Sequence, residues 1–181
     1  YRSILQRPGG MECALELHSM SKAYNMTGWR LGFFCGAEWA VDALAYIKDN
    51  CDSGQFKAIQ EAAAAVISDV SVAESISLHY ETRLKKMVKA LQAVGFEASM
   101  PGGTFYLYVK APVGAGESTF DSAEDAALHL IETQGISTVP WDNTGAYLRF
   151  GAVFESAGDE DDDRVLQILE ERLQHADLRF E

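Results

Sequence analysis

Two short apolar runs joined by a polar segment constrain the fold of this chain more than any other feature. The runs Cys13 to Leu17 and Leu31 to Gly36 each have the length and composition of a buried strand. Strands of this kind occur in parallel sheets, which helices cover on both faces. The polar segment places a lysine, Lys22, just after the end of the first strand. The pattern therefore predicts an α/β fold with a chemically useful amine at a strand end.

Lys22 is flanked in the sequence by groups that suit one kind of ligand. A lysine held in an apolar α/β interior tends to have a lowered pKa, and its amine can form a Schiff base with a carbonyl compound. Ser19 and Ser21 supply hydroxyl donors, and Arg30 supplies a guanidinium that matches the geometry of a phosphate. An aldehyde and a phosphate together describe pyridoxal phosphate. A lysine in a polar loop is more often simply solvated, so these four residues alone leave both interpretations open.

The complete segment is more specific than these four residues. Residues 19–33 read SMSKAYNMTGWRLGF, which closely resembles the cofactor-lysine segment of the class I and II aminotransferases, the fold type I pyridoxal-phosphate enzymes. The resemblance implies that Lys22 forms the Schiff base with pyridoxal 5'-phosphate and that Ser19 and Arg30 bind its phosphate. Ser21 is a further cofactor-binding candidate because it is adjacent to Lys22. The resemblance covers essentially the whole chain, which corresponds to the C-terminal half of an aminotransferase.

A second motif lies far along the chain, at residues 145–151, which read GAYLRFG. Its alternation predicts a strand with Tyr147 and Arg149 on one face and Leu148 and Phe150 on the other. From the residues alone, an arginine on such a strand is most often part of a surface ion pair. The aminotransferase resemblance implies a different role, in which Arg149 binds the α-carboxylate of the substrate.

A third segment narrows the resemblance. Residues 50–60 read NCDSGQFKAIQ and look like the corresponding stretch of the LL-diaminopimelate aminotransferases. In that family the loop approaches the active site of the partner subunit. The resemblance therefore implies a homodimer in which Ser53 and Gln55 serve the neighbour's substrate pocket. The alternative from the residues alone is a turn in which Asp52 or Ser53 caps the next helix.

Periodic apolar positions predict the remaining elements. The longest run, residues 71–94, places an apolar stripe on one side of a helix about 36 Å long and charged residues such as Arg83 elsewhere. Residues 159–163 are acidic because they lie in the predicted first turn of the last helix, where negative side chains are favourable. We expect shorter helices over residues 37–50, 56–67, 122–133 and 159–175, further strands over residues 96–100, 104–109, 136–140 and 145–154, and a loop over residues 112–118.

These elements match one part of the aminotransferase architecture. The implied fold class is α/β: the end of the parallel sheet of a large cofactor-binding domain, a long linking helix, and an α+β small domain. Because a long helix connects the two domains in this family, we place the domain boundary inside the run 71–94. The expected domains are residues 1–82, the C-terminal part of the large domain, and residues 83–181, the small domain.

Charge and composition exclude several classes of function. A net charge of −12 argues against nucleic acid and anionic membranes as partners, because both require a basic surface. No apolar run approaches the roughly 20 residues of a membrane span. Cys13, Cys35 and Cys51 form no C-x-x-C pair and indicate reduced thiols in a cytoplasmic protein, with Cys13 and Cys35 in core strands. The histidines are dispersed, so no metal site is predicted.

The resemblance implies ping-pong transamination, in which an amino group moves between an amino acid and a 2-oxo acid. LL-diaminopimelate and the dicarboxylic amino acids are the candidate donors. A fold type I lyase or decarboxylase would share Lys22, Ser19 and Arg30, and a non-catalytic dimerisation or binding fragment with a relict lysine is a further alternative. The family's groups that tune the cofactor ring lie upstream of this segment, so we expect the 181-residue chain alone to be inactive.

Overall fold

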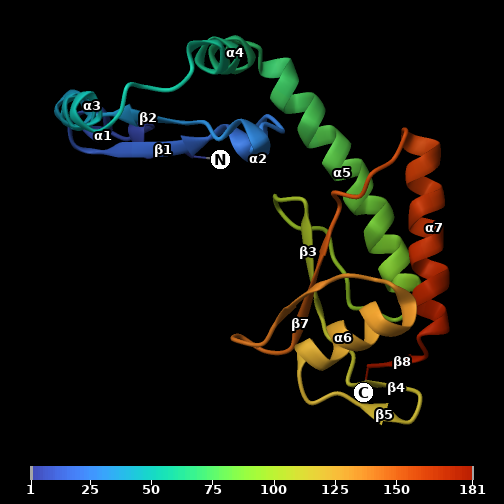
Figure 1. Ribbon diagram of the computed structural model, residues 1–181. Coiled ribbons are helices and arrows are strands. Elements are labelled where there is room, and N and C mark those ends of the chain that lie inside the picture. The colour runs from blue at the N-terminus through green and yellow to red at the C-terminus, as the bar shows by residue number, and fades with distance from the viewer. Residues whose placement is uncertain (1, 181) are drawn as a thin grey trace. The chain divides into compact units, whose positions relative to one another are not determined.

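The computed structural model describes residues 2–180, in which helices and strands are mixed along the whole chain (Figure 1). Two compact units are present: the N-terminal unit ends at Leu78 and the C-terminal unit begins at His79. The division falls inside helix α5 (Val70–Ala93), as does the predicted domain boundary after residue 82. The outermost residues of the predicted domains, Tyr1 and Glu181, lie outside the described residues, and the domain assignment stays a prediction.

The N-terminal unit is built on a two-stranded antiparallel sheet (Figure 1), in which β1 (Leu15–Ser19) pairs with β2 (Gly32–Gly36). The prediction of a parallel sheet is wrong for this pair. The connecting residues contain only α2 (Met20–Ala23) and the 3-10 turn η2 (Thr27–Trp29). These short turns return the chain to the same end of the sheet, whereas a parallel pair needs a full crossover, usually through a longer helix.

The first strand begins two residues later than predicted. Residues Gly10–Cys13 form the short helix α1, so Cys13 is an exposed helix residue rather than part of a core strand. Cys35 on β2 is half-buried. The prediction of buried strands is also wrong for β1, because 76% of the Leu17 surface is exposed. The described residues supply no third strand to this sheet, and its faces therefore stay partly open.

Two helices follow the sheet, close to their predicted bounds. α3 spans Glu38–Cys51 and α4 spans Lys57–Ser68. The N-cap of α4 is Phe56, which makes no side-chain capping hydrogen bond. The alternative in which Asp52 or Ser53 caps this helix is therefore wrong.

The strands of the C-terminal unit form two small antiparallel sheets. In the first, β7 (Tyr147–Gly151) lies between β3 (Tyr106–Lys110) and β6 (Val139–Trp141). In the second, β4 (Gly114–Ala115) lies between β5 (Ser118–Thr119) and β8 (Leu178–Arg179). The prediction of a loop over residues 112–118 is therefore wrong where β4 and β5 pair.

The predicted strand over residues 96–100 does not form. The Phe96 amide donates to the Leu91 carbonyl at 3.0 Å, and Gln92 Nε2 donates to the Ala98 carbonyl at 2.8 Å. These local bonds replace a strand partner. Phe96 and Ala98 are nevertheless buried, so the alternation correctly indicates a buried face although no neighbouring strand pairs with it.

One hydrophobic core fills the C-terminal unit, and helices α6 (Ala123–Gln134) and α7 (Asp159–His175) contribute to it together with the second half of α5. The predicted alternation of β7 is confirmed, since Leu148 and Phe150 are buried. Ser122 caps α6 by accepting a hydrogen bond from a backbone amide in its first turn. Among residues 2–180, no helix combines the length and apolar character that crossing a membrane requires.

A buried ion pair joins α5 to α7. Arg83 donates from Nε and Nη2 to the two carboxylate oxygens of Asp162, at 2.9 and 2.8 Å. Asp162 also accepts a hydrogen bond from the Ser156 hydroxyl. Only 7% of Arg83 and 1% of Asp162 are exposed. The prediction that Arg83 faces away from the apolar side of α5 is therefore wrong. The position of residues 159–163 in the first turn of α7 also explains their acidic character only in part, because Asp162 pairs with Arg83.

Candidate cofactor and substrate site

The candidate cofactor segment is the turn between β1 and β2. Ser19, the last residue of β1, is the N-cap of α2, and its Oγ accepts a hydrogen bond from the Ser21 amide at 3.2 Å. Lys22 is the third residue of α2, just beyond the strand end as the sequence predicts. Arg30 follows η2 and precedes β2 by two residues. The four predicted residues therefore belong to one continuous segment of the N-terminal unit.

Hydrogen bonds connect this segment from end to end. Thr27 Oγ1 donates to the Ser21 carbonyl at 2.8 Å, and Arg30 Nη1 donates to the Thr27 carbonyl at 2.9 Å. With the bond between Ser19 and Ser21, these contacts link the serines to the arginine. Sequence reasoning missed Thr27, because its role depends on how the turn folds back rather than on a spacing.

Two backbone features shape the return into β2. Arg30 has a φ of 52°, a left-handed conformation that side chains other than glycine rarely adopt. Gly32 pairs with Ser19, and a Cβ added there would lie 2.6 Å from the His18 carbonyl oxygen. Glycine at position 32 therefore allows the two strands to approach each other directly beside the candidate site.

Met20 and Met26 anchor the segment to α4. Both methionines are buried and form the small core of this unit with Ala63. Lys22 and Arg30, in contrast, are exposed. The apolar interior expected around Lys22 is not formed by the described residues, because the sheet beside it has two strands and partly open faces.

The chemistry of this donor set fits pyridoxal phosphate. Arg30 has no carboxylate partner among residues 2–180, and its one side-chain hydrogen bond there goes to a backbone carbonyl. A guanidinium and a serine hydroxyl such as that of Ser19 can both donate to phosphate oxygens. The primary amine of Lys22 can condense with an aldehyde. The segment therefore offers partners for both ends of such a cofactor.

Arg149 lies on β7, the central strand of its sheet, on the face opposite Leu148 and Phe150. Its guanidinium carbon lies 4.4 Å from the centre of the Tyr106 ring and 5.9 Å from that of Trp141. Within residues 2–180 no carboxylate pairs with Arg149, and its buried Nε has no hydrogen-bond partner. The alternative of a surface ion pair is therefore not supported, and the guanidinium remains open to an anion.

The predicted site residues fall in the two different units. Ser19, Ser21, Lys22 and Arg30 belong to the N-terminal unit, and Arg149 belongs to the C-terminal unit. The structure thus groups the cofactor candidates in one segment. That Arg149 shares a site with them stays a prediction.

The loop between α3 and α4 carries Ser53 and Gln55, and both are exposed. Asp52 shapes this loop, because its carboxylate accepts hydrogen bonds from Lys48 Nζ at 2.8 Å and from the Gly54 amide at 2.7 Å. These hydrogen bonds lower the pKa of Asp52. The role of Ser53 and Gln55 at a partner subunit stays a prediction.

Three side chains of the metal-ligating type meet on one face of the β1–β2 sheet. The ligand atoms of Glu16, His18 and Cys35 lie within 4.8 Å of one another. Spacing in the sequence does not show this cluster, since strand pairing brings Cys35 opposite Glu16. His18 Nε2 lies 2.9 Å from one Glu16 oxygen, and the other accepts hydrogen bonds from Ser3 and Ile4. A cation would have to displace these contacts.

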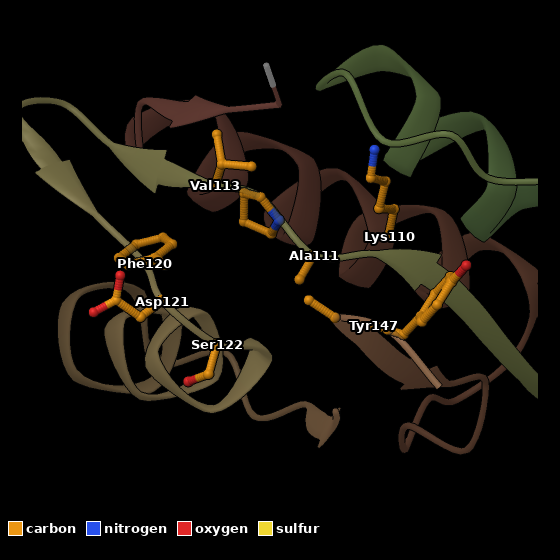
Figure 2. Close-up of a pocket in the computed structure, with 10 residues that line it drawn as sticks. Lys110, Ala111, Val113, Phe120, Asp121, Ser122 and Tyr147 are labelled. Atoms are coloured by element: carbon orange, nitrogen blue, oxygen red, sulfur yellow. The ribbon is translucent and has the colours of Figure 1, made fainter. Parts of the chain in front are cut away.

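A cavity of about 180 Å³ lies in the C-terminal unit. Figure 2 shows Lys110 and Tyr147 on one side of it and Phe120, Asp121 and Ser122 on the other. None of the predicted site residues lines this cavity. Its lysine and aspartate carry opposite charges, so the lining does not favour one class of ligand.

Known proteins match the sequence of this chain over nearly its whole length. The family described as aminotransferase class I and II matches residues 6–160, a range that includes Lys22 and Arg149. The chain is 48% identical over 188 residues to LL-diaminopimelate aminotransferase from Methanocaldococcus jannaschii. This alignment covers 99% of the chain and 45% of the relative, so the chain spans less than half the length of this curated relative.

Solved structures agree at the level of the fold. The substrate-bound BacF structure from Bacillus subtilis matches with a TM-score of 0.76 and 28% identity, over 93% of this chain and 41% of that chain. The aspartate aminotransferase from Rhizobium meliloti matches with a TM-score of 0.75 and 23% identity, over 95% of this chain and 44% of that chain. The mixed α/β class is confirmed, whereas its finer division into sheet, linking helix and small domain stays a prediction.

Proposed function

Because the chain belongs to the class I and II aminotransferases, we propose that it is the C-terminal part of a pyridoxal-phosphate enzyme that moves an amino group between an amino acid and a 2-oxo acid. The observation that carries the proposal is the hydrogen-bonded segment from Ser19 to Arg30, with Lys22 inside it. The 48% identity to an LL-diaminopimelate aminotransferase supports LL-diaminopimelate as the first donor to test. A dicarboxylic amino acid is the second candidate. The activity is proposed for the full-length protein.

In the proposed site, this segment holds the cofactor at both ends. Ser19, Ser21 and Arg30 bind the phosphate, and Lys22 binds the aldehyde carbon covalently. Thr27 keeps the Arg30 side chain tied to the Ser21 backbone. The pyridine ring supplies the electron sink for a carbanion at the substrate α-carbon. When its amine is not attached, Lys22 removes and returns the α-proton.

Arg149 binds the α-carboxylate of both substrates in this proposal. A planar guanidinium pairs bidentately with a carboxylate, and the amino acid and the 2-oxo acid both carry that group. One arginine can therefore serve both half-reactions. The support for this role is that no described carboxylate neutralises Arg149 and that its buried Nε lacks a partner.

The proposed assembly is a homodimer in the cytoplasm. Ser53 and Gln55 contribute to the substrate pocket of the partner subunit, which their exposure on a loop supports. Cys13, Cys35 and Cys51 are free thiols in the described chain, as expected for a reducing compartment.

Reductive trapping tests the covalent role of Lys22. The full-length protein is incubated with pyridoxal 5'-phosphate, reduced with borohydride, digested and mapped by mass spectrometry. We expect the adduct on the peptide that contains Lys22, and we expect Lys22→Ala to abolish both adduct and turnover. Lys57→Ala is the matched control, because Lys57 is an exposed lysine paired with Glu61 on α4. An adduct on a different lysine would overturn the assignment.

Product analysis separates the alternatives. With LL-diaminopimelate, a transaminase converts the cofactor to its pyridoxamine form and releases a 2-oxo acid. An eliminated fragment or carbon dioxide would instead identify a lyase or a decarboxylase. A full-length protein that binds no cofactor would identify a non-catalytic role.

A further inference from the structure

Arg149 is restrained by aromatic rings rather than by an opposite charge. Its guanidinium carbon lies 4.4 Å above the Tyr106 ring and 5.9 Å from the Trp141 ring, and it has no carboxylate partner within residues 2–180. We propose that Tyr106 is a positioning residue for Arg149: its ring fixes the plane of the guanidinium for the incoming carboxylate. This inference rests on the proposed function of Arg149.

The strand register explains how Tyr106 reaches Arg149. Tyr106 on β3 pairs with Gly151, which lies two residues beyond Arg149 on the same face of β7. A Cβ added at Gly151 would lie 3.6 Å from the Tyr106 ring and 3.3 Å from Val153. The Tyr106 ring therefore lies against position 151 at ordinary van der Waals distance, and from there it extends over the Arg149 guanidinium.

The Tyr106 ring is itself held in place by other rings. Its centre lies 4.5 Å from that of Phe105, which lies 5.1 Å from that of Tyr80 on α5. A chain of aromatic contacts thus connects Arg149 to a helix that contributes to the core of the same unit. The guanidinium consequently lies against a ring that is itself in contact with other aromatic side chains.

An aromatic surface has a chemical advantage over a carboxylate at this position. A ring attracts a cation through its π-face and stacks on a guanidinium, but it does not neutralise the positive charge. A carboxylate partner would have to be displaced by the substrate carboxylate, at the cost of a broken ion pair. Tyr106 can therefore orient Arg149 while leaving its full charge for the substrate.

Steady-state kinetics on the full-length holoenzyme test this role. With LL-diaminopimelate as donor, Tyr106→Leu should raise KM about 3- to 30-fold, the range of a cation–π contact, with kcat little changed. Tyr106→Phe keeps the ring and should restore KM. Tyr147→Leu is the matched control, because it removes a tyrosine ring from the same sheet two residues from Arg149 and should leave KM unchanged.

A double-mutant cycle separates positioning from simple packing. In an Arg149→Ala background, Tyr106→Leu should change KM no further, since its effect passes through the arginine. Additive losses would indicate a structural role and overturn the inference. Thermal unfolding checks that each variant folds, and Tyr106→Met is the second ring-free variant if Tyr106→Leu does not fold.

The two proposals fail in different ways. If Arg149→Ala raises KM while Tyr106→Leu behaves like the parent enzyme, the positioning role is wrong and the carboxylate role of Arg149 stands. If Arg149→Ala keeps the parent KM, the carboxylate role is wrong and the role of Tyr106 falls with it.

Discussion

Replacing Asp162 by alanine should lower the free energy of unfolding of the C-terminal unit by about 3–5 kcal/mol. The substitution leaves Arg83 as a charged side chain that is 7% exposed and has lost its carboxylate. A buried charge without a partner keeps its desolvation cost but loses the attraction that offsets it. The loss should therefore be large for a single substitution.

The contacts around Arg83 give this magnitude. Two hydrogen bonds to the carboxylate, at 2.9 and 2.8 Å, disappear, and hydrogen bonds to charged groups contribute about 1.5–3 kcal/mol each. The guanidinium keeps the Ser156 hydroxyl at 2.6 Å, the Phe154 carbonyl at 2.9 Å and the Phe154 ring at 4.4 Å. These remaining partners offset part of the stability that is lost with the two hydrogen bonds. Arg83→Met combined with Asp162→Leu should recover most of the loss, because no charge then stays buried.

Urea unfolding followed by tryptophan fluorescence measures the effect. Trp29 and Trp39 lie in the N-terminal unit, so phenylalanine at both positions leaves Trp141 as the reporter of the C-terminal unit. Asp163→Ala is the matched control, because the neighbouring Asp163 is exposed and its ion pair with Lys86 lies at the surface. Exposed pairs contribute little, so this control should unfold almost like the parent. If Asp162→Ala costs no more than Asp163→Ala, the reasoning about the buried pair is refuted.

Other perturbations test acid stability, strand approach and carboxylate binding. Burial raises the pKa of Asp162, but its hydrogen bonds and the Arg83 charge outweigh burial and hold that pKa below its ordinary value. Its contribution to stability is therefore present above about pH 4 and is lost as the pH falls toward the folded-state pKa. Urea titrations at several pH values should show a smaller fall in the free energy of unfolding over this acidic range for Asp162→Asn than for the parent. Gly32→Ala brings a Cβ within 2.6 Å of a carbonyl oxygen and should cost about 1–3 kcal/mol in thermal unfolding, whereas Gly28→Ala, with no atom within 4 Å, should cost little. Arg149→Ala should weaken substrate-carboxylate binding by about 2–5 kcal/mol without changing pyridoxal-phosphate affinity, as ligand titrations of the full-length protein can show.

Each of these expectations has an outcome that contradicts it. If the free energy of unfolding falls equally at acidic pH in Asp162→Asn and in the parent, the pH dependence belongs to other carboxylates. Equal melting temperatures for Gly32→Ala and Gly28→Ala would show that the strands can separate without loss. A near-normal kcat/KM for Arg149→Ala would return that residue to a structural role.

Local signals in the sequence account for most of the helices and for few of the long-range contacts. Helix α7 has the predicted bounds Asp159–His175, because an acidic first turn and an apolar period are both local features. The pair of Arg83 and Asp162 is separated by 79 residues, and it forms only when α5 packs against α7. The two-residue strands β4 and β8 likewise depend on pairing between distant segments, which no local pattern encodes.

In the candidate site, too, the sequence motif identifies the residues, whereas their surroundings depend on tertiary packing. The motif identifies Ser19, Lys22 and Arg30 as one segment, and the structure joins that segment by hydrogen bonds. The exposure of Lys22 follows from the number of strands beside it, which periodicity does not determine. The ring of Tyr106 reaches Arg149 only through the register of β3 and β7, and register is set by tertiary packing.

Helix α5 belongs to both units, and its backbone amides should report that division by hydrogen–deuterium exchange. Its second half contains six buried residues, from Arg83 to Leu91, whereas Val70 and Leu78 in its first half are 71% and 63% exposed. Amides of the second half open only when the core around them opens, and those of the first half can open by fraying from the helix end. One continuous helix should therefore show two levels of deuterium protection, with a step between Leu78 and Arg83.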